Sequence, residues 1–464
     1  MEIKAGIFRE YDIRGVVGPD IDETLARALG YVFAKTVCAE CPAITSPRVA
    51  VGYDCRLSGE MLREALTEGL VKGGVQVIEC GMGPTPQLYF ATVTQSLEGG
   101  IQVTGSHNPG DQNGFKMMIG GRTLSGLDVQ RLKDGIVSLS SAELASAPYS
   151  ASRRNSYPAQ KLYIEELISR SKEHIGKRPV RVVVDGGNGV GGMVGPAVLR
   201  GLGCEVIELY TEPDGRFPNH HPDPTELENL HDLQRLVLSE KADLGIAWDG
   251  DADRIGVVDE LGNPIFGDML LLIYGRQLLK EVKKPIIIGD VKCSELMFQR
   301  LRSEGADAVM AKTGHSLIKA KLKELHAELA GEMSGHMFFA HRYYGFDDAL
   351  HAAARLVEIV SNTDQTVSSM LADLPKTCTT PELRVECPDE IKFRVAEKAK
   401  ASFGEFEVNT LDGVRITFPH GWGLVRASNT QPVLVMRFEA DSPDRLDQYR
   451  TLVEDRIRSI QQSV

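Results

Sequence analysis

Ser106 lies in a short polar loop that directly follows an apolar run of the chain. The loop is Thr104-Gly-Ser-His-Asn-Pro109, and residues 100–103 before it are predicted to form a strand. A glycine before the serine allows a sharp backbone turn, and the proline ends any helix that would include the loop. A serine hydroxyl needs a neighbouring base or metal to act as a nucleophile, and His107 stands next to it. An ordinary polar turn has a similar composition, so the loop alone indicates a candidate nucleophile.

Lys116, in Asn113-Gly-Phe-Lys116, is a second candidate for acid–base chemistry. Burial among other cations readily lowers the pKa of a lysine, which then exchanges protons near neutral pH. The sequence therefore marks Lys116 as a candidate for proton handling.

Three aspartates alternate between two apolar segments: Asp249, Asp251 and Asp253. Carboxylates this close repel one another unless a cation neutralises them, and oxygen ligands favour Mg²⁺ or Ca²⁺. An EF-hand is the first competitor, since Glu260 falls at its twelfth position. Its sixth position is Arg254 instead of glycine, however, and both flanks are predicted strands. The aspartates predict a metal site that is not an EF-hand.

Gly187-Asn-Gly-Val-Gly-Gly192 fits the GxGxxG pattern after a predicted strand that ends at Asp185. With Glu205 and Glu208 downstream, it matches the fingerprint of a dinucleotide-binding turn. A glycine-rich strand–helix turn that allows close packing gives the same pattern. A dehydrogenase would not need the serine loop and the aspartates together.

A fourth polar loop, near the end of the chain, has the composition of a phosphate cradle. It offers one guanidinium with short hydroxyl and amide donors, a set that holds phosphate oxygens well. A capped surface turn would look similar. The candidate residues are Arg426, Ser428, Asn429 and Thr430.

The elements that would position these loops follow a repeated pattern. Three Val/Ile-rich runs end in an aspartate, as strands buried on both faces of a parallel sheet do. Each is followed by a helix-length segment, a second strand and a third strand, the third copy being the least regular. The runs are residues 47–54, 179–185 and 285–290; the second strands are 74–78, 203–207 and 305–309; the third strands are 100–103, 243–248 and 327–330.

A polar loop follows the third strand of each copy: residues 104–109, 249–254 and 331–336. Ligands of open α/β sheets gather at the carboxyl ends of the strands. Repeated strand–helix–strand units indicate α/β domains with right-handed crossovers. We therefore predict three similar α/β domains, with mixed, mostly parallel sheets, around a central cleft.

The last ninety or so residues differ from these units. Three prolines mark a linker-like region, followed by short strands at 413–418 and 433–438 and a charged amphipathic helix from about 443 to 461. This order indicates a small α+β domain. The predicted domains are therefore 1–152, 153–260, 261–374 and an α+β domain at 375–464.

The composition is that of a globular protein, and the 464 residues suggest about three domains, with two or four also possible. A formal charge of −12, from 52 basic and 64 acidic residues, argues against a nucleic-acid or anionic-membrane surface. The apolar runs are short of a bilayer span, and the first residues lack the pattern of a signal peptide. We expect a cytoplasmic protein with no membrane partner. Of its eight cysteines, Cys38 and Cys41 form a CxxC with no second pair to complete a zinc site.

Together the four loops resemble the signature loops of the α-D-phosphohexomutase superfamily, in the same order along the chain. Other segments resemble the bacterial phosphomannomutase/phosphoglucomutase branch of that superfamily, and the resemblance extends through all four predicted domains. These segments are Phe8-Arg-Glu-Tyr-Asp-Ile-Arg-Gly15, Pro218-Asn-His-His-Pro222, Asp290-Val-Lys-Cys293 and Thr313-Gly-His-Ser316.

The resemblance implies an enzyme that interconverts hexose 1-phosphates and 6-phosphates through a phosphoserine at Ser106. The bound intermediate would be glucose 1,6-bisphosphate or mannose 1,6-bisphosphate. The three aspartates and the phosphoserine would hold Mg²⁺. The substrate would be held by a sugar loop, a phosphate loop and further cleft residues. These are Glu332, Ser334 and His336; Arg426, Ser428, Asn429 and Thr430; and Tyr11, Arg14, Lys116, Arg254, Lys292 and His315, with His107 and Arg254 beside the reaction.

Met333 bears on the choice of sugar. The phosphoglucosamine branch usually carries Gln at this position, so the resemblance implies mannose and glucose phosphates as substrates. Phosphoglucosamine mutase remains an alternative, and a dehydrogenase using the Gly187–Gly192 turn and a calcium-binding scaffold are alternatives of other classes. Gly110 and Gln112 stand where the family pattern has Pro and Tyr. We expect small-molecule partners only and a monomer or weak homodimer.

Overall fold

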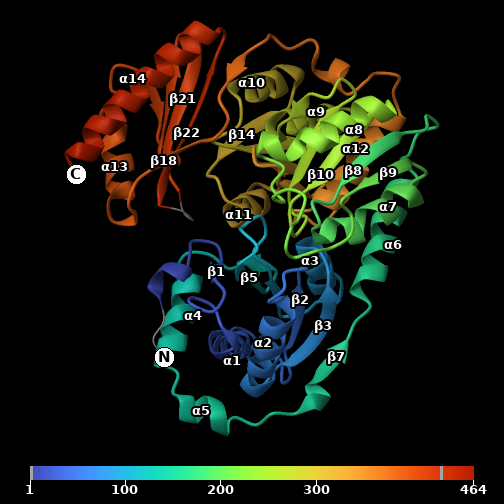
Figure 1. Ribbon diagram of the computed structural model, residues 1–464, viewed down its shortest axis with the longest axis vertical. Coiled ribbons are helices and arrows are strands. Elements are labelled where there is room, and N and C mark those ends of the chain that lie inside the picture. The colour runs from blue at the N-terminus through green and yellow to red at the C-terminus, as the bar shows by residue number, and fades with distance from the viewer. Residues whose placement is uncertain (1–3, 429–431) are drawn as a thin grey trace. The chain divides into compact units, whose positions relative to one another are not determined.

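The computed structural model describes residues 4–428 and 432–464, which divide into two compact units (Figure 1). The first unit contains residues 4–270 and 334–370, and the second contains 271–333 and 371–464. Two sheets lie in each unit, and helices pack on them.

The first unit holds a seven-stranded and a five-stranded sheet. Their strand orders are β1-β5-β4-β2-β3-β7, with β6 paired to β5, and β12-β11-β10-β8-β9. The strands are β1 (Ile13–Val16), β2 (Arg48–Tyr53), β3 (Gln76–Met82), β4 (Gly99–Val103), β5 (Gln112–Ile119), β6 (Arg122–Thr123), β7 (Arg154–Ser156), β8 (Arg181–Asp185), β9 (Glu205–Leu209), β10 (Leu244–Trp248), β11 (Ile255–Asp259) and β12 (Pro264–Ile265).

The second unit holds three parallel strands and a six-stranded antiparallel sheet of order β17-β22-β21-β20-β19, in which β18 also pairs with β22. The strands are β13 (Ile286–Asp290), β14 (Asp307–Ala311), β15 (Leu329–Gly331), β17 (Cys378–Thr379), β18 (Leu383–Glu386), β19 (Glu407–Asn409), β20 (Val414–Phe418), β21 (Gly421–Ala427) and β22 (Val433–Ala440); β16 (Met337–Phe339) belongs to the first unit.

Fourteen α-helices are assigned in the described residues. They are α1 (Glu23–Glu40), α2 (Gly59–Gly73), α3 (Thr85–Thr94), α4 (Leu127–Ser138), α5 (Ser141–Ser146), α6 (Ala159–Lys172), α7 (Gly195–Gly201), α8 (His231–Glu240), α9 (Gly267–Glu281), α10 (Glu295–Glu304), α11 (His315–Leu325), α12 (Ala349–Ser361), α13 (Asp389–Ala401) and α14 (Pro443–Gln462).

The repeat predicted from the sequence is present three times. In each copy the first strand of the repeat pairs in parallel with the second and the third, which gives the orders β4-β2-β3, β10-β8-β9 and β15-β13-β14. Strands β4 and β10 are buried along their whole length, as central strands of a covered sheet are. The predicted α/β fold class is therefore confirmed, and the third strand of each copy ends beside the first.

The strands β5 and β11 continue from the first two polar loops. Each runs antiparallel to the strand before its loop, β5 to β4 and β11 to β10. Since β11 flanks the three aspartates on one side and β10 flanks them on the other, the loop between them is a β-turn region and not the helix–loop–helix of an EF-hand.

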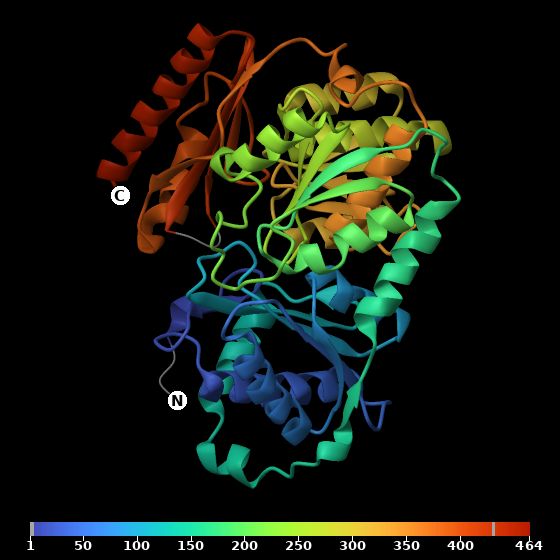
Figure 2. The ribbon, with the colours of Figure 1, turned by 45° about the vertical axis from the view of Figure 1, so that its right-hand side comes forward.

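The C-terminal sheet has the predicted strands and the predicted final helix. β20, β22 and α14 correspond to the strands at 413–418 and 433–438 and to the helix at 443–461. α13 and α14 pack on the sheet around a core that includes Phe403 and Phe438, and Figure 2 shows α14, in dark red, along the sheet.

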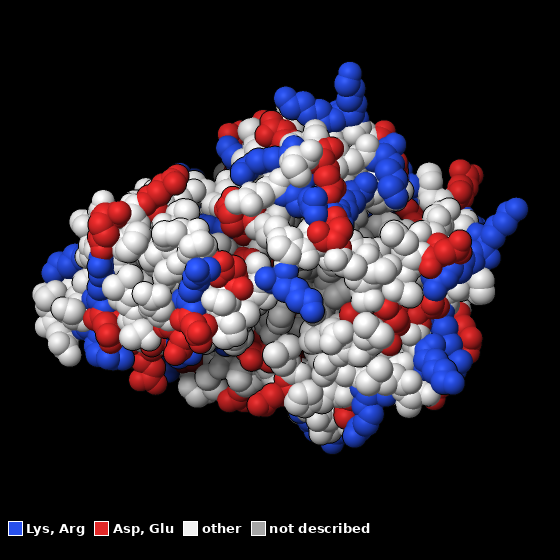
Figure 3. Space-filling model, turned by 90° about the horizontal axis from the view of Figure 1, so that it is seen from above, with Lys and Arg blue, Asp and Glu red and all other residues white. Residues whose placement is uncertain are grey.

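The protein carries charged side chains of both signs, 52 Lys and Arg against 64 Asp and Glu. Figure 3 shows Lys and Arg side chains interspersed with Asp and Glu side chains on the face that it presents.

Within residues 4–428 and 432–464, no helix is long and apolar enough to cross a membrane. Cys38 packs against the core of the first sheet, and both it and Cys41 are free thiols.

Asp348 caps the amino end of α12 and binds two tyrosines. Its carboxylate accepts hydrogen bonds from the His351 amide at 2.8 Å and from the hydroxyls of Tyr163 and Tyr343 at 2.8 Å and 2.7 Å. Burial raises the pKa of Asp348 to about 6 from an ordinary 3.8, although these bonds oppose the shift. The carboxyl therefore holds α12 to α6 within the first unit.

We predict that Asp348→Asn gains stability relative to the wild type as the pH rises. A carboxyl with a raised pKa contributes stability below its unfolded pKa and loses it as the pH rises through about 6. The amide cannot ionise, so the difference in unfolding free energy should shift by about 3 kcal/mol between roughly pH 3 and pH 7. Thermal or denaturant unfolding across this range measures it. Asp364→Asn, at an exposed position, is the control, and parallel pH profiles for wild type and Asp348→Asn would contradict the prediction.

Candidate active site

Ser106 stands at the carboxyl end of β4 with a buried hydroxyl. Its backbone has φ of 51°, a left-handed conformation that few non-glycine residues adopt. The Ser106 amide donates to Thr104 Oγ1 at 2.8 Å, and the Ser106 hydroxyl donates to Asp249 Oδ2 at 2.8 Å. His107 Nδ1 lies 3.1 Å from the same hydroxyl. The serine thus has both a carboxylate and an imidazole within hydrogen-bond distance.

The three aspartates converge because the loop between β10 and β11 turns back on itself. Ala252, between two of them, has φ of 56°, and its amide donates to the Asp249 carbonyl at 3.0 Å. The amides of Asp253 and Arg254 both donate to Asp249 Oδ1 at 3.1 Å. One oxygen from each of the three buried carboxylates lies within 4.8 Å of the others.

The serine loop and the aspartate loop are in direct contact at Gly250. A Cβ atom on Gly250 would lie 2.4 Å from the carbonyl oxygen of Ser106, closer than real Cβ contacts. A side chain at this position would therefore push the serine away from the aspartates.

Lys116 extends from β5 into the aspartate cluster. Its Nζ lies 2.6 Å from Asp251 Oδ2 and also forms an ion pair with Asp253. Burial alone would lower the pKa of Lys116, but the two carboxylates raise it above its ordinary value. This direction is opposite to the one expected from the sequence, because the neighbours of Lys116 are carboxylates as well as cations.

Asp251 has one carboxylate oxygen that remains available to a ligand. Its Oδ2 accepts a hydrogen bond from Thr85 Oγ1 at 2.5 Å and faces Lys116, whereas its buried Oδ1 has no hydrogen-bond partner among the described residues. An unsatisfied buried carboxylate oxygen is costly unless a cation or water meets it. With three oxygen donors this close, the cluster fits a divalent metal.

The carboxyls of the cluster differ in their electrostatics. Burial and the charges of Asp251 and Asp253 raise the pKa of Asp249 well above its ordinary value. Burial would do the same for Asp253, but Lys116 and His336 bring the pKa of Asp253 well below its ordinary value. Burial and the positive charges of Arg254 and Arg14 lower the pKa of His107, which is therefore neutral at neutral pH.

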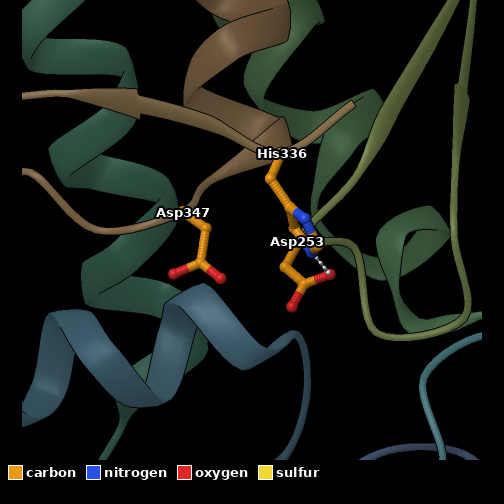
Figure 4. Close-up of side chains that lie close together, drawn as sticks. All are labelled: Asp253, His336 and Asp347. Carbon is orange, nitrogen blue, oxygen red and sulfur yellow. Dashed lines mark hydrogen bonds and ion pairs between the residues drawn. The ribbon is translucent and has the colours of Figure 1, made fainter. Parts of the chain in front are cut away.

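His336 joins the cluster from the loop before β16. Its Nε2 lies 3.2 Å from Asp253 Oδ1 and 3.3 Å from Arg254 Nε, while Nδ1 lies 3.4 Å from Ser334 Oγ. Figure 4 shows the His336 ring beside Asp253, with Asp347 to the left of them. Asp253, His336 and Asp347 form a second buried set of ligand atoms within 4.8 Å.

Arg14 reaches the serine loop from β1. The Arg14 guanidinium donates to Asp12 at 2.7 Å, to Asn108 Oδ1 at 3.0 Å and to the Gly105 carbonyl at 3.3 Å. Tyr11, two residues before β1, is buried.

The predicted residues of the second unit form a separate group. Lys292 Nζ lies 3.0 Å from Glu382 Oε2. Burial would raise the pKa of Glu382, but Lys292 lowers it to about 2. Conversely, burial would lower the pKa of Lys292, and Glu382 and Asp290 raise it. The ion pair holds both groups charged.

Hydrogen bonds connect the predicted phosphate loop of the second unit to the start of α11. Arg426 Nε donates to Asp412 Oδ2 at 3.0 Å, and the same oxygen accepts the Thr313 amide at 3.1 Å. Glu332 Oε1 accepts the Gly314 amide at 2.6 Å, directly before His315. Ser428 is buried at the end of this region. The predicted contacts of Asn429 and Thr430 lie outside the described residues.

The predicted residues thus fall into two sets, one in each compact unit. The sugar loop divides between them, with Ser334 and His336 in the first unit and Glu332 in the second. The set in the first unit is Tyr11, Arg14, Ser106, His107, Lys116, Asp249, Asp251, Asp253, Arg254, Ser334 and His336; the set in the second is Lys292, His315, Glu332, Arg426 and Ser428.

Three contributors to the first set were not predicted from the sequence. Thr85 binds Asp251, Asp347 lies beside His336, and Arg56 binds the carbonyl oxygens of the serine loop. The sequence holds a signal near two of them that could have drawn attention to them. Arg56 stands two residues after Asp54, which ends a predicted strand, and Asp347 is one of two adjacent aspartates.

The glycine-rich turn at 187–192 packs against the aspartate loop. The Val190 amide donates to the Gly250 carbonyl at 3.1 Å, and the turn continues into a short 3₁₀-helix at Val190–Met193. This contact is the close packing that the sequence offered as the alternative to dinucleotide binding.

Family models match nearly the whole chain. They are described as phosphoglucomutase/phosphomannomutase alpha/beta/alpha domains I, II and III and C-terminal domain, and they match residues 5–141, 161–262, 266–378 and 378–456. The chain therefore belongs to the phosphoglucomutase/phosphomannomutase family of the α-D-phosphohexomutase superfamily, as its four loops predict. The enzyme class of this family is that of the mutases.

Full-length relatives agree with this assignment. The phosphomannomutase/phosphoglucomutase of Pseudomonas aeruginosa is 44% identical over 464 residues, which cover 100% of this chain and 97% of the relative. A phosphoglucomutase of Neisseria gonorrhoeae is 42% identical over 99% of this chain and 98% of its own. The crystal structure of a phosphoglucomutase/phosphomannomutase family protein from Burkholderia thailandensis has a TM-score of 0.88 and 40% identity, covering 100% of this chain and 98% of that one.

We predict that a divalent cation raises the melting temperature of the wild type and has a much smaller effect on Asp251→Asn. The cation would relieve repulsion among three buried carboxylates, and a ligand at 100 times its Kd stabilises by about 2.7 kcal/mol. Thermal unfolding with Mg²⁺ against EDTA measures the effect. Asp307→Asn, at an exposed position outside the cluster, should respond like the wild type. An equal response of Asp251→Asn would show that the cation binds elsewhere.

Proposed function

We propose that the protein interconverts the 1-phosphates and 6-phosphates of glucose and mannose through a phosphorylated Ser106. The observation that carries the proposal is the buried Ser106 hydroxyl, which is hydrogen-bonded to Asp249, while Lys116 pairs with the other two aspartates of the cluster. Family membership supports the reaction class.

The reaction consists of two phosphoryl transfers, one from the serine to the sugar and one from the sugar to the serine. In the first, a hydroxyl oxygen of the sugar monophosphate forms a bond to the phosphorus of phosphoserine 106, the bond from phosphorus to Oγ breaks, and the hydroxyl proton passes to a base. The product is a hexose 1,6-bisphosphate. After the bisphosphate reorients, Ser106 Oγ forms a bond to the phosphorus of its other phosphoryl group, the bond from that phosphorus to the sugar oxygen breaks, and the base returns a proton to that oxygen, which leaves the isomeric monophosphate and a phosphoserine.

The charges of the first unit suit this chemistry. Phosphoryl transfer depends mainly on positioning and on neutralising the equatorial oxygens. A divalent cation, which we propose is Mg²⁺, would be held by the three aspartates and would supply part of that neutralisation. Lys116, Arg14 and Arg254 would supply the rest from the chain itself.

Two groups are proposed to handle protons beside the serine. The neutral His107 ring lies 3.1 Å from the Ser106 hydroxyl. It would form a hydrogen bond with Ser106 Oγ while the charge on Oγ changes during transfer. Lys116 is the other candidate from the sequence. Its two ion pairs favour the charged form in the described state, so its proposed contribution is primarily electrostatic.

Recognition of the sugar and of its distal phosphate is assigned to the remaining predicted residues. Glu332, Ser334 and His336 would hold vicinal hydroxyls of the sugar, with the carboxylate as acceptor. Cationic and hydroxyl groups would hold the phosphate and line the cleft, and the enzyme would act as a monomer or weak homodimer. These groups are Arg426, Ser428, Asn429, Thr430, Tyr11, Lys292 and His315.

We predict that Ser106→Ala loses turnover by roughly 10³-fold or more, because no other oxygen can carry the phosphoryl group. Folding should be retained, as the change removes one hydroxyl. A coupled assay for glucose 6-phosphate formation measures turnover. Intact-mass spectrometry of wild type should show a form heavier by about 80 Da that maps to Ser106 and is absent from the variant.

Ser169→Ala, at an exposed position on α6, is the matched control and should retain both activity and mass profile. Near-normal turnover of Ser106→Ala would remove Ser106 from the mechanism. Loss of turnover without a phosphorylated form of the wild type would instead argue against the phosphoserine.

We predict that glucose 1-phosphate and mannose 1-phosphate are turned over with kcat/KM values within about tenfold, and that glucosamine phosphates are much poorer. The proposed sugar loop commits no additional polar group to C2, so discrimination there should be weak. Comparing kcat/KM for the three sugars on one preparation tests this. Met333→Gln, which adds an amide beside that loop, should raise the relative value for glucosamine. A preference of the wild type for glucosamine would overturn the branch assignment and leave the mutase chemistry standing.

A further inference from the structure

Arg56 lies in the segment between the end of β2 and the start of α2, and its side chain is completely buried. The guanidinium donates to four backbone carbonyl oxygens. Nη2 contacts the carbonyls of Ser106 at 2.8 Å and Asn108 at 2.5 Å, and Nη1 contacts those of Pro109 at 2.5 Å and Gln112 at 2.8 Å. All four carbonyls belong to the chain segment that runs from the candidate nucleophile into β5.

The guanidinium is suited to this arrangement by its shape. It presents five N–H donors in a rigid planar fork, whereas a lysine ammonium is a single charge on a flexible stem. Four carbonyls from one segment can therefore be fixed at once, and the segment is held in one curvature. Phe217 lies against the guanidinium with its ring centroid 5.2 Å from Cζ.

Asp54 fixes both Arg56 and the start of the same loop. Its carboxylate accepts the Arg56 amide at 2.9 Å and lies 3.2 Å from Arg56 Nε. It also accepts the Thr104 hydroxyl at 2.7 Å and the Gly105 amide at 3.3 Å. Because Thr104 Oγ1 in turn accepts the Ser106 amide, the loop is tied before and after its serine.

Gly105 shows how closely the loop fits around the guanidinium. A Cβ atom at this position would lie 2.5 Å from Arg56 Cζ, so a side chain there would displace the guanidinium. Ser106, the next residue, has the left-handed φ of 51°. Such a conformation persists in a non-glycine residue where the surrounding contacts impose it.

We infer that Arg56 is a positioning residue that holds Ser106 in its left-handed conformation, with Oγ directed at Asp249. The inference rests on the proposed function of Ser106 as the phosphoryl carrier. The Arg56 side chain has no exposed surface through which to touch a substrate, and the four backbone carbonyls that it binds all lie in residues 106–112. Its removal should therefore lower kcat and leave KM nearly unchanged, because the groups proposed to bind the sugar phosphate are untouched.

The first test compares Arg56→Lys and Arg56→Ala with the wild type. A misplacement of about 1 Å can cost on the order of 10²-fold in rate, so we expect kcat to fall by about that factor with KM within about threefold. Guanidinium ion at millimolar concentration should restore part of kcat to Arg56→Ala, and the same concentration of ammonium should not. Arg302→Lys is the control, since Arg302 also donates to a backbone carbonyl, that of Ala308, in the second unit.

A second variant, Gly105→Ala, disturbs the same contact from the loop side. Its methyl group should displace the guanidinium and lower kcat in the wild-type background. In the Arg56→Ala background the displaced group is absent, so the same change should cost much less. Additive losses in kcat would show that the loop and the guanidinium do not act together.

Hydrogen exchange of the loop amides gives a readout that does not require turnover. Residues 105–112 should exchange at least about tenfold faster in Arg56→Lys than in the wild type or in Arg302→Lys. If the wild type proved to have no mutase activity, the proposed function would fail, and this measurement would still decide whether Arg56 holds the loop. Unchanged kcat in Arg56→Lys, or equal exchange, would overturn the inference.

Discussion

The repulsion among three buried carboxylates beside Ser106 is the constraint on which the rest of the first unit depends. Asp249, Asp251 and Asp253 offer ligand oxygens within 4.8 Å of one another, where unscreened like charges cannot all persist. The ammonium of Lys116 and two backbone amides that donate to Asp249 reduce this repulsion. These groups leave one oxygen of Asp251 without a partner among the described residues, which is the position a divalent cation would complete.

Parallel strand order explains how a serine and an aspartate 143 residues apart can meet. In each α/β copy the third strand lies beside the first, so its following loop emerges at the same sheet edge as the buried aspartate that ends or follows the first strand. In the first unit, the loop after β4 emerges at the edge of one sheet and the loop after β10 at the edge of the other, and the two loops contact each other. Gly250 allows that contact, since its missing side chain leaves space for the Ser106 carbonyl.

The sequence predicted the parts of this site whose chemistry is local. Ser106 and the aspartates stand in short motifs with recognisable spacing, and β-branched runs identified the strands before them. Arg56 and Asp347 stand next to such signals without belonging to a motif, and Thr85 has no signal at all, because each of the three contacts a segment distant in the sequence. The pKa of Lys116 could not be predicted for the same reason: its direction depends on whether folding surrounds the ammonium with cations or with carboxylates. The strand β5 was missed, although the loop before it was identified.

The aspartates at the ends of β2, β8 and β13 extend this argument to both units. Asp54, following β2, accepts the Gly105 amide of the serine loop, and Asp290, ending β13, accepts the Met333 amide at 3.2 Å. Burial raises the pKa of both Asp54 and Asp290. Asp185 differs, since it accepts the Gly187 amide and contacts His220 instead of the aspartate loop. A loop already crowded with carboxylates would be repelled by one more, so the second copy anchors its aspartate loop through the amides that bind Asp249. The same structural position thus anchors the neighbouring loop in the first and third copies, and it contacts other partners beside the loop that carries three aspartates.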